Sequence, residues 1–156
     1  DLLGGAVVVM RRVGTGESYS GEISIDLFQG KTFKSKEYLA QALRVVAEGM
    51  EKLLVSKEEP IHICSGYILS RAKEAMINEG YTVKSVKIIG PTQELAEQEF
   101  LKSLARLGVG DMFTVFRKRS FNSFLEWVHG DLRARERFVK TGWTSWSRLR
   151  EEGASP

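Results

Sequence analysis

The spacing of apolar residues in the first 30 positions is typical of β-strands. Residues 5–13 form an apolar, β-branched run, and residues 19–29 alternate between apolar and polar side chains. The segment Gly14-Thr15-Gly16 lies between them, and two such runs around a glycine-containing turn predict an antiparallel hairpin.

Further along, the apolar period lengthens to three or four residues, which predicts an amphipathic helix over residues 36–54. The same criteria predict, in order, a strand over 61–64, a helix over 67–79, a strand over 82–89 and a helix over 91–107. This β-β-α-β-α-β-α order predicts an α/β protein. Its mixed sheet would combine the N-terminal antiparallel hairpin with parallel β-α-β units, flanked by helices.

The pattern changes again near residue 110, and we divide the chain there. Residues 1–110 are predicted to form the α/β core domain, and residues 111–156 a basic, Trp-rich helical extension packed on or next to it. Within the extension, helices are expected over 120–128 and 132–140, and residues 112–116 are one more strand or an extended link.

Composition excludes several classes of protein. A length of 156 residues suits one domain, and a single cysteine with two histidines argues against a disulfide framework or a multi-cysteine zinc site. No apolar run approaches the roughly 18 residues that a membrane span requires, and no signal-peptide pattern opens the chain. We therefore expect no membrane partner and a cytoplasmic, intracellular location.

Positive charge is concentrated in the extension. Residues 1–110 hold 14 Lys/Arg and 14 Asp/Glu, whereas residues 111–156 hold 9 and 6. Basic side chains neutralise phosphates and exposed tryptophans stack on unpaired bases, so this pattern indicates nucleic-acid contact. The predicted contact residues are Arg117, Lys118, Arg119, Arg133, Arg137, Lys140 and Trp143. Packing of the tryptophans onto the body, or a homodimer interface, explains the same pattern.

Candidate catalytic chemistry lies on the helix over 91–107. Glu97 precedes Phe100 and Leu101 by one turn, so it lies on their apolar stripe, and Gln93 lies four residues earlier on the same face. Both side chains are expected near the end of the preceding strand, where α/β sheets usually bind ligands. Glu97 is our candidate metal ligand or general base, and Gln93 would orient the substrate. A core-edge glutamate reaching toward water is the structural alternative.

The order of elements over residues 5–108 resembles the ribonuclease H-like fold. That family's sheet begins with three antiparallel strands, so the resemblance implies a further strand upstream of Asp1. Family members that cut nucleic acid hold two metal ions with carboxylates, and Glu97 resembles the carboxylate of the last helix. Glu48 would replace the first-helix carboxylate only if it faced inward, and the strand ending at Cys64 supplies no acid.

The leading hypothesis is therefore a ribonuclease H-like protein that binds nucleic acid. In its catalytic form it would be a metal-dependent nuclease in which Glu97 holds Mg²⁺. The alternative is a non-catalytic structural or interaction protein that homodimerises through its extension. A third hypothesis is a small-molecule enzyme that uses the edge formed by residues 64–66 and 90–93.

Overall fold

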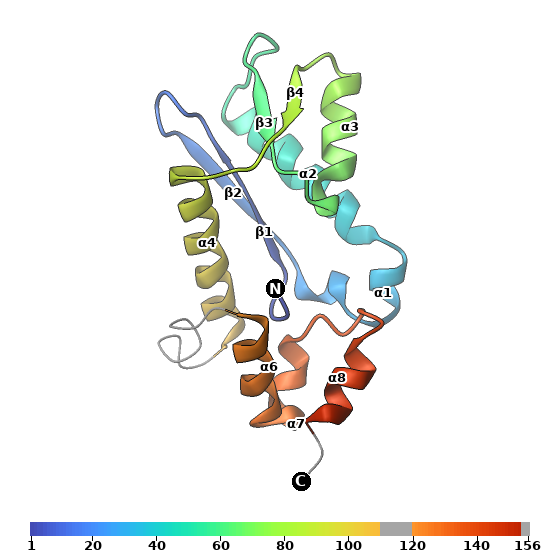
Figure 1. Cartoon of the computed structure of the whole chain (residues 1–156). Coiled ribbons are helices and arrows are strands. Elements are labelled where there is room, and N and C mark those ends of the chain that lie inside the picture. Colours follow the sequence, from blue (N-terminus) through green and yellow to red (C-terminus); the bar gives the residue numbers. More distant parts are fainter. Residues whose placement is uncertain (110–119, 154–156) are drawn as a thin grey trace.

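The computed structural model describes residues 1–109 and 120–153, and it is a mixed α/β structure (Figure 1). Its strands are β1 (Ala6–Arg11), β2 (Ser18–Ile23), β3 (Ile61–Ile63) and β4 (Val83–Ser85). Its helices are α1 (Gly30–Lys34), α2 (Glu37–Lys52), α3 (Ser70–Asn78), α4 (Pro91–Leu107), α6 (Phe121–His129), α7 (Leu132–Arg135) and α8 (Trp146–Glu152). Three 3-10 turns complete it: η1 (Ile25–Phe28), η2 (Tyr67–Leu69) and η3 (Glu136–Phe138).

The strands form two separate sheets instead of the single mixed sheet that the sequence predicts. β1 pairs with β2 in antiparallel fashion, with Val8 opposite Gly21, and β3 pairs with β4 in parallel, with Ile61 opposite Val83. Across residues 1–109 and 120–153, no backbone hydrogen bond reaches the other edge of β1 or of β3. The α/β class is thus confirmed, and the continuous sheet is corrected to two pairs of strands.

Two elements are shorter than predicted because other hydrogen bonds end them, one local and one long-range. The second strand stops at Ile23, since the Ser24 side chain accepts a hydrogen bond from the backbone amide of Asp26 and starts η1. The Asp131 side chain caps α7, and the helical segment ends at Phe138 and not at residue 140 as predicted. Val139 is extended there, because it forms an antiparallel bridge with Leu3.

The first core forms where α2 packs on the hairpin. Val8 and Ile23 are buried with Val45 and Val46 of α2, and the same cluster extends to Ile63 of β3 and to α3. Helix and hairpin approach closely at Gly49, where a Cβ atom would lie 2.5 Å from the Met10 sulfur. A larger residue at this position would require the Met10 and Tyr19 side chains to shift.

The second core joins the extension to the body. Leu104 of α4, Phe124 and Val128 of α6, and Leu2 and Leu3 at the N-terminus are fully buried together. Val7 packs against this cluster, whereas its neighbour Val8 packs in the first core. Since successive strand residues point to opposite faces, β1 is covered by a different core on each face.

Backbone pairing fixes the N-terminal residues against the extension. The Gly4 amide donates to the Phe138 carbonyl at 2.8 Å, and the Lys140 amide donates to the Leu2 carbonyl at 3.0 Å. Within the described ranges, no helix has both the length and the apolar character that crossing a bilayer requires.

The second core provides a test of this packing. Phe124 is fully buried, so we expect Phe124→Ala to lower the free energy of unfolding by about 3–5 kcal/mol. Urea denaturation followed by circular dichroism measures the change. Phe121→Ala is the matched control, because Phe121 lies on the same helix with 40% of its surface exposed. Equal losses in the two variants would contradict the second core.

Candidate ligand-binding site

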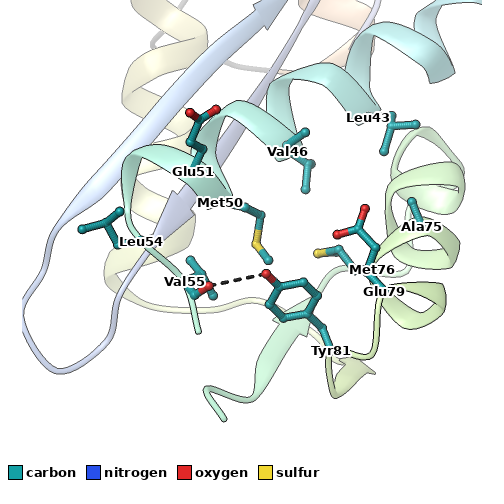
Figure 2. Close-up of a pocket in the computed structure, with 11 residues that line it drawn as sticks. Leu43, Val46, Met50, Glu51, Leu54, Val55, Ala75, Met76, Glu79 and Tyr81 are labelled. Atoms are coloured by element: carbon teal, nitrogen blue, oxygen red, sulfur yellow. Dashed lines mark hydrogen bonds between the residues drawn. The ribbon is translucent and has the colours of Figure 1, made fainter. Parts of the chain in front are cut away.

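Two hollows lie in the described part of the molecule, and only one of them contains residues that the sequence singled out. The first, of about 390 Å³, lies between α2 and α3 and is lined mainly by aliphatic and thioether groups. Figure 2 shows Met50 and Met76 beside the ring of Tyr81, whose hydroxyl donates to the Val55 carbonyl at 3.5 Å. Glu51 and Glu79 add carboxylates to this groove, which offers no basic or nucleophilic group.

The second hollow, which we call the aromatic cavity, has a volume of about 550 Å³. It lies where the N-terminal segment, α1, α2, η2, α4 and the extension meet. Its lining is dominated by aromatic rings, together with an amide, two carboxylates and an amine: Phe28, Phe33, Tyr38, Tyr67, Phe100 and Trp143, then Gln93, Asp1, Glu97 and Lys140. The size and the mix of apolar walls with few polar groups are typical of sites for small organic ligands.

Three stacked rings form one wall of the aromatic cavity. Tyr38 lies between Phe28 and Phe33, with ring centroids 5.2 Å and 5.3 Å away and interplanar angles of 27° and 11°. Burial raises the pKa of the Tyr38 hydroxyl above its usual value, so the phenol stays protonated at neutral pH. The wall is therefore apolar, and the Tyr38 hydroxyl adds one proton donor to it.

Lys140 is the unusual member of the lining. The side chain is buried, with 5% of the residue exposed, and its Nζ donates to the Leu3 carbonyl oxygen at 3.0 Å. Nζ also lies 5.3 Å from the centroid of the Phe28 ring. Because burial disfavours the charged form, the pKa of Lys140 falls to about 7. This placement differs from the solvent-facing, phosphate-binding role that the sequence predicts for Lys140.

Gln93 and Glu97 meet as predicted on one face of α4. The Gln93 amide donates to a Glu97 carboxylate oxygen at 3.2 Å, and both residues line the aromatic cavity. Both are exposed, however, whereas Phe100 and Leu104 further along the helix are buried. The two polar groups thus provide hydrogen-bonding capacity at the boundary between the cavity and solvent.

Positive charges flank the cavity beside Tyr67. The Lys36 Nζ donates to the Tyr67 hydroxyl at 3.1 Å, and Tyr67 is 57% exposed. The charges of Lys36 and Arg71 both act on Tyr38, which lines the cavity with Tyr67. An anionic group attached to a bound ligand would find these two cations near the exposed ring.

Several aromatic and basic residues in the described part of the extension contact one another. Trp146 is buried and donates to Glu136, which also pairs with Arg150 at 2.7 Å. The Arg135 guanidinium lies 4.5 Å from the Trp127 ring centroid. These contacts stabilise the second core and its rim.

The other predicted nucleic-acid contacts have different environments. Trp143 is half-buried in the aromatic cavity, whereas Arg133 and Arg137 are exposed to solvent. The Arg137 guanidinium lies 4.6 Å from the centroid of the Phe138 ring. Arg117, Lys118 and Arg119, like the link predicted over 112–116, lie outside the described residues.

The described residues do not fit the Mg²⁺ site that the ribonuclease H-like resemblance implies. Two-metal nucleases need several carboxylates around the ions. Nowhere in residues 1–109 and 120–153 do three or more His, Cys, Asp or Glu side chains group so as to hold a metal. Glu48 is exposed, and one of its carboxylate oxygens accepts from the Tyr19 hydroxyl at 2.6 Å. No reaction step is therefore assigned to Mg²⁺.

Most of the aromatic residues that line the cavity were not predicted as site residues from the sequence. Phe28, Phe33, Tyr38 and Tyr67 come from segments that carry no motif, and they read as ordinary core residues. The third hypothesis, a small-molecule enzyme, came nearest to the observed cavity. It placed the site at the edge after β3 and before α4. The cavity takes Gln93 from that edge, whereas none of residues 64–66 lines it and Tyr67 follows directly after them.

The buried amine of Lys140 has a signature in the pH dependence of stability. Its folded pKa of about 7 lies below that of an unfolded lysine, so between these values only the unfolded chain holds the proton. The contribution of Lys140 to stability therefore increases by about 1.4 kcal/mol per pH unit above neutrality. We expect urea denaturation from about pH 7.5 to about pH 9.5 to show this rise in the wild type and not in Lys140→Met.

Lys87→Met serves as the control for that experiment, because Lys87 is exposed. It should retain the wild-type slope. Parallel pH profiles for the wild type and Lys140→Met would show that the amine is charged in the folded protein.

Comparison with known proteins identifies no relatives. No family model matches the chain, and no match is found among curated proteins or among solved structures. The ribonuclease H-like resemblance stays a prediction. The aromatic cavity is therefore the basis on which a function can be proposed.

Proposed function

We propose that the protein binds single-stranded nucleic acid by taking one unpaired base into the aromatic cavity. The observation that carries this proposal is the concentration of aromatic rings in the cavity lining, because bases stack on aromatic side chains. Stacking of a base on aromatic side chains contributes about 1–3 kcal/mol and tolerates any base. Tyr67, which is 57% exposed, and the half-buried Trp143 also line the cavity and supply two further rings for this contact.

The polar lining supports the same proposal. A bound base needs hydrogen-bond partners along its edge, and Gln93 offers both a donor and an acceptor. Glu97 offers an acceptor, which suits the exocyclic amine of cytosine. Both lie at the boundary of the cavity, so a base would enter with its ring among the aromatic side chains and its edge toward α4.

Cations around the cavity can neutralise the phosphates of a bound strand. Lys36 and Arg71 lie beside Tyr67 and Tyr38, and Arg133 and Arg137 are exposed on the extension. Each phosphate that is neutralised releases counterions, so binding is expected to weaken as salt is added. Arg117, Lys118 and Arg119 remain predicted contributors. Nuclease activity and homodimerisation through the extension also remain predictions, and the observations on the cavity favour neither.

Substitution of Tyr67 tests the proposal. We expect Tyr67→Ala to weaken binding of a labelled single-stranded oligonucleotide by roughly 5- to 150-fold, the equivalent of one lost stacking contact. Fluorescence anisotropy at low salt measures the affinity. Tyr67→Phe keeps the ring and should retain most of it. Phe121→Ala removes an exposed ring outside the cavity and should bind like the wild type.

Comparing an oligonucleotide with the matching mononucleotide distinguishes a nucleic-acid site from a site for free nucleotides. If the cavity serves nucleic acid, the oligonucleotide binds more tightly than the matching mononucleotide, and added salt weakens it more. Equal affinities would assign the cavity to free nucleotides. Absence of binding by both forms would overturn the proposal.

Glu97 supplies a separate test of base selection. Its carboxylate accepts from the amine of cytosine, whereas thymine presents a carbonyl oxygen there. We expect oligo-dC to bind about 5-fold more tightly than oligo-dT, a difference of about 1 kcal/mol, and Glu97→Gln to remove this preference. Glu94→Gln is the matched control, because Glu94 is exposed on the same helix and does not line the cavity. An unchanged preference in Glu97→Gln would exclude Glu97 from base recognition.

A further inference from the structure

Lys140 has surroundings that differ from those of a surface lysine. It lines the aromatic cavity, it is 5% exposed, and its Nζ has the Leu3 carbonyl as a hydrogen-bond acceptor. In the described part of the chain, no carboxylate forms an ion pair with it. Burial removes water from an ammonium ion in this position, and no described carboxylate compensates for that loss, so the neutral amine is favoured.

A neutral lysine amine has a lone pair and is a nucleophile, which an ammonium ion is not. The Leu3 carbonyl accepts one N–H and holds the end of the side chain in place without taking the lone pair. The chain therefore places a buried nucleophile among the residues that line the aromatic cavity. Base binding alone does not require such a group.

We infer that Lys140 is a nucleophilic residue that forms an imine with an aldehyde entering the aromatic cavity. The Nζ lone pair attacks the carbonyl carbon, and the carbonyl oxygen takes up a proton to give a carbinolamine. Loss of that oxygen as water, with departure of the remaining Nζ proton, leaves a carbon–nitrogen double bond. Amine and aldehyde thus give imine and water, and no oxidant or reductant is consumed.

Two groups of the same cavity are suited to the proton transfers. Tyr38 keeps its phenolic proton at neutral pH and can donate it to the carbonyl oxygen. Glu97 carries a carboxylate that can accept the proton released from nitrogen. The stacked rings of Phe28, Tyr38 and Phe33 favour an aldehyde attached to a flat aromatic ring.

Reductive trapping on the full chain tests this inference. Benzaldehyde with sodium cyanoborohydride at pH 7 converts an imine into a stable benzyl-lysine, which peptide mapping by mass spectrometry locates. About half of the Lys140 amine is neutral at that pH, against fewer than about one in a thousand for an ordinary lysine. We expect Lys140 to be labelled at least about 10-fold faster than the exposed Lys36 and Lys87.

The controls separate a reactive site from general labelling. Lys140→Met should lose only the fast-labelled peptide, and Tyr38→Phe should slow labelling of Lys140 while sparing the exposed lysines. The wild-type map decides the question even if a variant folds poorly. Labelling of Lys140 that is no faster than that of Lys36 and Lys87 would overturn the inference.

This inference stands apart from base binding. Trapping at Lys140 without oligonucleotide affinity would leave the imine site and remove the nucleic-acid proposal. Oligonucleotide affinity without trapping would leave the nucleic-acid proposal and remove the imine site.

Discussion

The packing of β1 on both of its faces is the constraint on which the rest of the structure depends. Val8 points into the first core with α2, and Val7 points into the second core with α4 and the extension. A strand with two apolar faces is the usual sign of a sheet buried between helices. Here a hairpin of only two strands meets that requirement, since the extension helps to cover the face that α2 leaves open.

The aromatic cavity is a consequence of joining these two cores. The first core contributes Phe28 and Tyr38, whereas the second contributes Phe100 and has Trp143 packed against it. Neither core alone encloses the space. Lys140 reaches it because the bridge between Leu3 and Val139 ends the helical segment and brings the following residue inward. The same backbone pairing therefore builds the fold and places the amine.

The sequence predicted local features well and long-range placement poorly. Hydrophobic period indicated the hairpin, α2, α4 and α6, because each depends on neighbouring residues. The meeting of Gln93 and Glu97 also followed from helical spacing.

Burial of Lys140 did not follow from local pattern, since it depends on a carbonyl that precedes it by 137 positions. The separation of the two sheets is equally long-range, because strand pairing is not encoded in the period of one strand.

The bridge between Leu3 and Val139 also has a consequence for biosynthesis. The first core is complete once residues up to Val83 have been made, whereas the second must wait for Trp146. During translation the Leu3–Val139 bridge cannot form before residue 139 has been made, so this contact of high sequence separation forms later than the first core.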